Sequence, residues 1–115
     1  MSHFSTVKTE LRQRESLVSA LEDLGYEPKH GGHPVRGYRG QTVEAELAVT
    51  LQDSADFGFV WNEANGAYEF VTDLDLWRQS MPIERFLSRL TQRYALNTVL
   101  KASLTEGFDV AEQRD

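Results

Sequence analysis

The sequence predicts a single α+β domain, in which a mainly antiparallel sheet of four to five strands carries two helices on one face. Three observations support this fold. One stretch alternates apolar and polar residues, two stretches repeat apolar residues at helical spacing, and segments containing Gly or Pro separate them. At 115 residues the chain is close to the commonest size of one domain, so we expect residues 1–115 to share one core.

A short strand and a helix come first. Residues 3–9 alternate Phe4 and Val7 with small polar residues, which favours a strand. Apolar residues then follow at helical spacing, namely Leu17, Val18, Leu21 and Leu24. Gly25 followed by Tyr26 predicts a left-handed C-terminal cap, in which Tyr26 packs back on the last turn at Leu21.

Residues 27–41 contain Gly, Pro and His and are predicted to form an irregular loop, or an irregular sheet edge, that leads into the central strand. The alternation begins directly after this loop. One face of the predicted strand carries Val43, Ala45, Leu47, Val49 and Leu51. Because the other face is polar, the strand is expected to be antiparallel and half buried.

A hairpin is expected next. Apolar residues share one face in each of its two predicted strands, namely Phe57, Phe59 and Trp61, then Tyr68, Phe70 and Thr72. Between the strands, Asn65 and Gly66 are expected to supply the positive φ angles of a hairpin turn. Carboxylates along the sheet are expected to lie on a solvated polar face, namely Glu44, Glu46, Glu69, Asp73 and Asp75.

The last third of the chain is predicted to be helical, with Pro82 in the first turn. Its apolar residues keep one face as far as Tyr94 and then change phase, which predicts a bend or a change of packing partner near Asn97. Gly107 is expected to end the helix before a short strand. Residues 109–115 are expected to form a flexible tail.

Composition excludes several classes of function. The net charge of -6 disfavours a general nucleic-acid binder, because the phosphate backbone would be repelled. The chain has no cysteine, which removes disulfides, thiolate metal sites and cysteine nucleophiles. No segment approaches the ~18 apolar residues of a membrane helix, so we expect no membrane insertion. No phosphate-binding loop or dinucleotide fingerprint is present, and no cofactor is expected.

The strongest candidate site is the segment VRGYRGQ, residues 35–41. Its binding residues would be Arg36, Tyr38, Arg39 and Gln41. Guanidinium forks beside an aromatic face can hold phosphates, carboxylates or stacked bases. The alternative is that the arginines pair with the protein's own carboxylates while Gly37 and Gly40 serve a bulge.

The register of this segment separates the two interpretations. In one unbroken strand from Val35 to Leu51, Arg39 and Gln41 would point to the same face as Leu47. An unpaired guanidinium in a core is costly. Either the odd-numbered end therefore projects past the core, or a bulge at Gly40 reverses the face and turns Arg36 and Tyr38 inward.

The segment HGGH places His30 and His33 at a spacing that is also seen in zinc sites. The signal is weak, because the two glycines do not aim the imidazoles and no third ligand is fixed nearby. Solvated histidines are the simpler interpretation, and His30 and His33 remain the weak candidates for a metal.

Several segments resemble the hypothetical chloroplast reading frame thirty-five family, small proteins of cyanobacteria and red-lineage plastids. The resemblance is carried by MSHFSTVKTELR, LEDLGY, VRGYRGQ, GFVWNEANGAYEFVTDLDLW and LTQRYALNTVLKASLTEGF. It spans nearly the whole chain and implies a domain of unknown function in the cyanobacterial cytosol or plastid stroma, with a link to photosynthetic or plastid upkeep. It also implies a further strand after the final helix, where this chain is short and charged.

We therefore expect a non-enzymatic accessory or regulatory protein that binds a macromolecular partner or an anionic ligand through VRGYRGQ. An unidentified protein partner is favoured over nucleic acid. One alternative is a small metal-dependent enzyme or metal-binding protein that uses the HGGH loop. Another is single-stranded nucleic-acid binding through Arg36, Tyr38 and Arg39. A homodimer through an exposed sheet edge stays open.

Overall fold

The computed structural model describes residues 4–105 of the chain, which contain five strands and two α-helices. The strands are β1 (Phe4–Lys8), β2 (Lys29–Arg36), β3 (Thr42–Val49), β4 (Phe57–Asn62) and β5 (Ala67–Asp73). The helices are α1 (Arg14–Asp23) and α2 (Ile83–Thr105), with single 3-10 turns η1 (Tyr38–Gly40) and η2 (Leu74–Leu76). All strand pairs are antiparallel, in the order β1-β5-β4-β3-β2. The predicted α+β fold is therefore confirmed.

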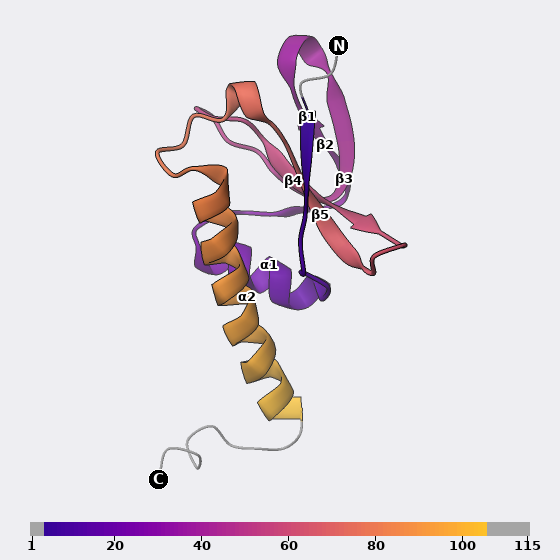
Figure 1. Cartoon of the computed structure of the whole chain (residues 1–115), viewed down its shortest axis with the longest axis vertical. Coiled ribbons are helices and arrows are strands. Elements are labelled where there is room, and N and C mark those ends of the chain that lie inside the picture. Colours follow the sequence, from indigo (N-terminus) through magenta and orange to yellow (C-terminus); the bar gives the residue numbers. More distant parts are fainter. Residues whose placement is uncertain (1–3, 106–115) are drawn as a thin grey trace.

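Both helices cover the same face of the sheet (Figure 1). The core between these layers is built from aromatic residues of β4 and β5 and apolar residues of the helices, namely Phe57, Phe59, Phe70, Leu17, Leu21, Phe86 and Leu90. The ring of Phe57 lies 5.0 Å from that of Phe86 in α2. The alternation of β4 and β5 therefore buries the face that the sequence predicted.

The predicted cap at the end of α1 is confirmed. Gly25 has a φ of 95°, in the left-handed region that glycine adopts without strain. The N–H of Tyr26 donates to the carbonyl of Leu21 at 3.0 Å, and the N–H of Gly25 donates to that of Glu22 at 3.0 Å. These two bonds form a Schellman motif, which satisfies carbonyls that the end of the helix leaves without partners.

The hairpin between β4 and β5 is present, but one detail of its turn was predicted wrongly. Gly66 has a φ of 63°, whereas Asn65 has a negative φ. The connection is longer than two residues, and a loop of this length needs the left-handed conformation only near its end. Asn62 closes the loop, since its side chain accepts the N–H of Asn65 at 3.2 Å and its carbonyl accepts that of Gly66 at 2.9 Å.

Of the two alternatives predicted for residues 27–41, the irregular sheet edge applies to residues 29–36, which form β2. Gly31 and Gly32 have φ angles of 85° and 76° and form a bulge, across which the register with β3 shifts. β2 is an edge strand, and among residues 4–105 no further strand pairs with its outer side. The N–H that Pro34 lacks is therefore not needed for a hydrogen bond on that side. Gly and Pro were therefore signs of an edge strand rather than of a loop.

The end of the β2–β3 hairpin curls over the face of the sheet that the helices leave open. Val35 is fully buried there in a second small cluster with Ala45, Ala48 and Val71. A methyl group added at Gly58 in β4 would lie only 2.6 Å from Cγ2 of Val35. One added at Gly37 would lie 2.5 Å from the ring of Phe4 in β1. These close approaches bring the end of β2 against β4 and the turn that follows it against β1.

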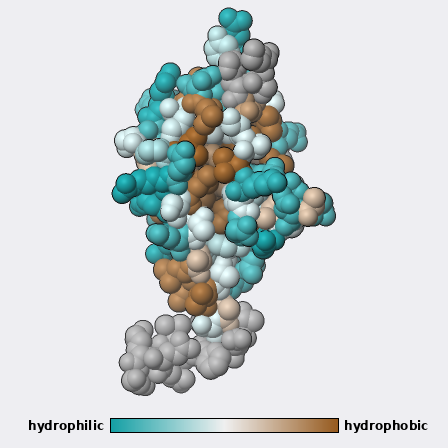
Figure 2. Space-filling view, viewed as in Figure 1, coloured by the Kyte–Doolittle hydropathy of each residue, from teal (hydrophilic) through white to brown (hydrophobic). Residues whose placement is uncertain are grey.

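The long helix α2 is unbroken from Ile83 to Thr105, and near Asn97 its packing partner changes, which was one of the two predicted alternatives. Asn97 donates to Asp23 at 3.0 Å and to Ser19 at 3.2 Å, which joins α2 to α1. Beyond this contact, Leu96, Val99 and Leu100 are exposed where α2 extends past the sheet. Figure 2 shows an apolar patch over this end of α2.

Two further predictions lie outside the described residues, namely the short strand after Gly107 and the flexible tail at 109–115. Among residues 4–105, neither helix combines the length and apolarity that a membrane span requires.

Candidate functional site

The segment VRGYRGQ forms the turn that joins β2 to β3, instead of running on as one strand. Arg36 pairs with Thr42 across the hairpin. The turn is closed by the N–H of Gly37, which donates to the carbonyl of Gln41 at 2.7 Å. Arg39 has a φ of 56° and Gly40 a φ of 79°. Neither predicted register applies, because η1 ends one strand and reverses the chain.

Arg36 is held by a buried carboxylate. Its Nε and Nη2 donate to Oδ2 and Oδ1 of Asp56 at 2.7 and 2.9 Å, and its backbone N–H donates to Oδ2 at 3.1 Å. The N–H of Leu51 donates to Oδ1 at 3.3 Å. Asp56 is only 3% exposed, whereas the side chain of Arg36 is 59% exposed. The pair therefore joins the turn to the segment before β4, with the carboxylate inside and the guanidinium at the surface.

The hydrogen bonds keep Asp56 ionised. Burial by itself raises the pKa of this carboxyl, but the bonds from the side chain and backbone of Arg36 and from the backbone of Leu51 outweigh it. The pKa of Asp56 is consequently lowered from its ordinary value. The same side-chain hydrogen bonds raise the pKa of Arg36.

A second buried carboxylate holds the tip of the turn. The N–H of Tyr38 donates to Oδ2 of Asp73 at 2.9 Å, and the N–H of Asp75 donates to Oδ1 at 3.0 Å. Asp73 is fully buried, so the prediction of a solvated face was wrong at this position. The reason is that backbone N–H groups of η1 and η2 replace the water that a carboxylate needs.

Tyr38 and Arg39 lie side by side at the exposed tip. The guanidinium carbon of Arg39 is 5.2 Å from the centroid of the Tyr38 ring, a cation–π geometry. Tyr38 is 41% exposed, and Arg39 is exposed as well. Of the four predicted binding residues, Tyr38 and Arg39 therefore lie together at the surface, whereas Arg36 forms an ion pair with Asp56. Gln41 is half buried at the base of the turn.

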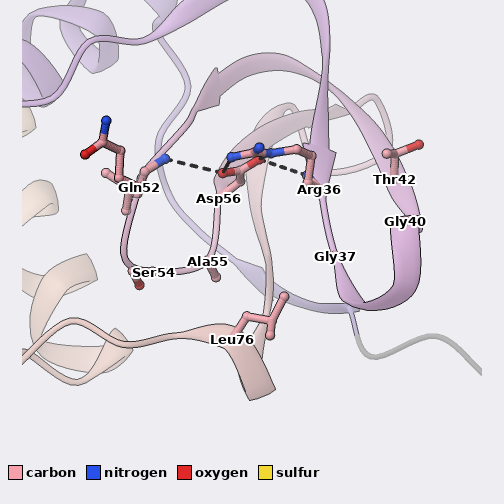
Figure 3. A pocket seen from close by; sticks show the side chains of 10 residues that line it. Arg36, Gly37, Gly40, Thr42, Gln52, Ser54, Ala55, Asp56 and Leu76 are labelled. Atoms are coloured by element: carbon pink, nitrogen blue, oxygen red, sulfur yellow. Dashed lines mark hydrogen bonds and ion pairs between the residues drawn. The ribbon is translucent and has the colours of Figure 1, made fainter.

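An open depression of about 500 Å³ lies between the turn and the β3–β4 loop (Figure 3). Its polar lining residues are Arg36, Thr42, Gln52, Ser54 and Asp56. Its apolar lining comes from Leu51, Ala55 and Leu76. Figure 3 shows Arg36 and Asp56 joined across the space between the end of β2 and this loop. Leu76 lies on the side of the depression that faces away from this pair.

The two histidines lie in β2, on either side of the bulge, and are exposed. Nδ1 of His30 is 2.8 Å from Nη2 of Arg14. A guanidinium has no acceptor, so Nδ1 must accept this bond and its lone pair is occupied. Among residues 4–105, no three His, Asp or Glu side chains form a group suited to a metal ion.

The buried partners Asp56 and Asp73 are what the sequence interpretation missed. A signal was available, because Asp56 directly precedes buried Phe57 and Asp73 directly follows buried Thr72. Acidic residues at the ends of buried strands often accept backbone N–H groups of adjoining turns. Their partners, 20 and 35 residues away, could not be identified from the sequence.

Comparison with known proteins shows similarity along the whole chain. A family model described as "Protein of unknown function (DUF1257)" matches residues 20–115. An uncharacterized protein ycf35 of Guillardia theta is 40% identical over 108 residues, which cover 94% of this chain and 83% of that protein. A protein of the same description from Cyanophora paradoxa is 30% identical over 113 residues, covering 98% and 87%. No solved structure matches.

Proposed function

Because this chain belongs to the DUF1257 family of proteins of unknown function, its role has to be inferred from its own residues, and we propose a non-enzymatic accessory protein. It binds a partner protein through Tyr38 and Arg39 at the exposed tip of the β2–β3 turn. The relatives in Guillardia theta and Cyanophora paradoxa confirm the resemblance to the hypothetical chloroplast reading frame thirty-five family. We place its activity in the cytosol of a cyanobacterium or the stroma of a plastid.

One observation carries this proposal: Arg39 has a left-handed backbone with its guanidinium against the exposed ring of Tyr38. A non-glycine residue in this conformation costs about 1 kcal/mol or more, and such strain is concentrated at functional sites. Glycine would avoid the strain but would provide no side chain. Tyrosine and arginine are also the residue types that most often dominate the energy of a protein interface.

The framework around the tip supports the same function. Asp56 holds Arg36, where the turn begins, and Asp73 holds the backbone of Tyr38 at its tip, so the tip loses little backbone freedom when a partner binds. The net charge of -6 favours a protein partner over the phosphate backbone of a nucleic acid. His30 already accepts a bond from Arg14, which weighs against the metal-binding alternative.

The substitution Arg39→Gly tests the proposal, because it removes the guanidinium and also relieves the strained backbone. We expect the melting temperature to stay the same or to rise, since glycine adopts a positive φ without cost. Proteins captured from a cyanobacterial extract by the tagged wild type should be lost with Arg39→Gly. Quantitative mass spectrometry identifies them, and titration of the purified partner then measures the loss of affinity.

Arg85→Ala is the matched control, because Arg85 is an exposed arginine on α2, which covers the other face of the sheet. It should capture the same proteins as the wild type. Unchanged capture with Arg39→Gly would contradict the proposal. So would equal loss with Arg39→Gly and Arg85→Ala, because that outcome indicates a general effect of positive charge.

A further inference from the structure

The guanidinium of Arg36 has a second edge that Asp56 does not use. A guanidinium carries five N–H donors in one plane. Asp56 accepts from Nε and from one N–H of Nη2, which form one side of the fork. The end of the fork, where Nη1 and Nη2 lie together, has the spacing of a carboxylate and can form a second bidentate pair.

This second edge is oriented in advance. Asp56 fixes the plane of the guanidinium with two bonds, and the backbone N–H of Arg36 anchors the same carboxylate. An exposed arginine normally loses considerable rotamer freedom when it binds a ligand. Here most of that freedom is already lost in the folded protein, although 59% of the side chain still faces solvent.

The surroundings of Arg36 favour a ligand that is both charged and apolar. Leu51, Ala55 and Leu76 provide an apolar surface in the depression of about 500 Å³, while Ser54 provides a hydroxyl group. The hydroxyl of Ser54 accepts the N–H of Arg78 at 2.8 Å, so its own proton can be donated to a ligand. Pockets for small molecules have this combination of apolar walls and few directed polar groups.

We propose that this depression binds a small monocarboxylate with an apolar body, its carboxylate on the outer edge of Arg36. This goes beyond the partner-binding tip, because it uses a different arginine and a different class of ligand. Charge selects a monoanion over a phosphate dianion. The Arg36–Asp56 pair is neutral as a whole, and the acidic residues Asp53 and Asp75 adjoin the lining residues Ser54 and Leu76 in the sequence.

Titrations with benzoate, phenyl phosphate and benzyl alcohol test this site on the purified protein. Amide chemical shifts of ¹⁵N-labelled protein report where each probe binds. Benzoate should shift the amides of Gly37, Gly40, Ser54, Ala55 and Leu76 with a Kd on the order of millimolar, as expected for a fragment. Phenyl phosphate, a dianion at pH 7.5, and neutral benzyl alcohol should each bind at least about fivefold more weakly. No shifts with benzoate, or equal affinity for benzyl alcohol, would overturn the proposal.

Arg36→Lys is the decisive variant, because lysine keeps the positive charge beside Asp56 but has no second edge. We expect the fold to persist and the affinity for benzoate to fall at least about fivefold, with Arg85→Ala as the unchanged control. Wild-type affinity in folded Arg36→Lys would overturn the site. If the variant does not fold, the three wild-type titrations still decide the question. Benzoate binding and partner capture by Arg39→Gly are separate measurements, so either proposal can fail alone.

Discussion

Arg36 and Asp56 join two segments that the sequence keeps 20 residues apart. Nε and Nη2 of Arg36 lie 2.7 and 2.9 Å from the two oxygens of a carboxylate that is 3% exposed. The bond from the backbone N–H of Arg36 adds a third contact at 3.1 Å. The pair therefore fixes the position of the β2–β3 turn over the open face of the sheet. The geometry of both proposed binding sites depends on this pair.

Replacing Arg36 by alanine should destabilise the protein, because it leaves the buried carboxylate of Asp56 without its charged partner. Breaking a fully buried pair costs ~3–5 kcal/mol, and we expect about 2 kcal/mol here because the guanidinium is largely solvated. Arg36→Lys should cost about 1 kcal/mol, since one charged bond remains. Urea unfolding measures both. A loss below about 0.5 kcal/mol for Arg36→Ala would show that the backbone N–H groups of residues 36 and 51, together with water, satisfy Asp56 without the guanidinium.

The contribution of Asp56 should depend on pH in one direction. Its pKa is lowered in the folded protein, so the ionised form stabilises the fold above the unfolded pKa of about 3.9. That stability is lost as the pH falls through the lowered folded value. The free energy of unfolding of the wild type should therefore exceed that of Asp56→Asn at pH 7 and approach it near pH 3.

Urea unfolding of both proteins at pH 7, 5 and 3 checks this expectation. The pKa of Asp23 is lowered as well, by hydrogen bonds from Asn97 and Arg93, and this adds a loss of stability at low pH. Both proteins share Asp23, so its effect cancels in their difference. A difference that stays constant from pH 7 to pH 3 would contradict an ionised, paired Asp56.

The faces of β4 and β5 could be predicted from the sequence, but the predicted alternation of β3 holds only in part. Leu47 and Val49 pack in the core under the helices, whereas Val43 and Ala45 lie in the cluster on the open face of the sheet. The faces of β4 and the cap at Gly25 were predicted because burial and capping leave local patterns. The curl of the β2–β3 hairpin was missed because it depends on contacts between distant residues, such as Val35 against Gly58. For the candidate site, the exposed tip residues were identified, but the carboxylates that hold them were not.

Gly58 should tolerate no side chain, because the curled hairpin lies directly over it. A methyl group there would lie 2.6 Å from Cγ2 of Val35, 2.8 Å from Cβ of Ala45 and 2.9 Å from the carbonyl oxygen of Leu47. Backbone atoms cannot move aside as a flexible side chain can, so we expect Gly58→Ala to cost about 1–3 kcal/mol. Urea unfolding measures this cost.

Gly66→Asn is the control for Gly58→Ala, because Gly66 lies in a turn at a φ of 63° that asparagine tolerates. It should change the free energy of unfolding by well under 1 kcal/mol. If Gly58→Ala were as stable as the wild type, the hairpin would have to lie further from β4 than described. Shifted amide signals at Arg36 and Tyr38 in Gly58→Ala would show that displacing the hairpin also displaces the site.

The two ends of α2 should respond differently to the same substitution. Leu90 is fully buried against the sheet, so Leu90→Ala should cost about 2–4 kcal/mol through lost burial and a cavity. Leu100 is 38% exposed on the projecting end, so Leu100→Ala should cost less than about 1 kcal/mol. Urea unfolding of both variants compares them within one helix. If Leu100→Ala lost as much free energy of unfolding as Leu90→Ala, Leu100 would have to be covered in solution by a surface that residues 4–105 do not provide. If that loss became smaller when the protein is diluted, the surface would belong to a second copy of the chain.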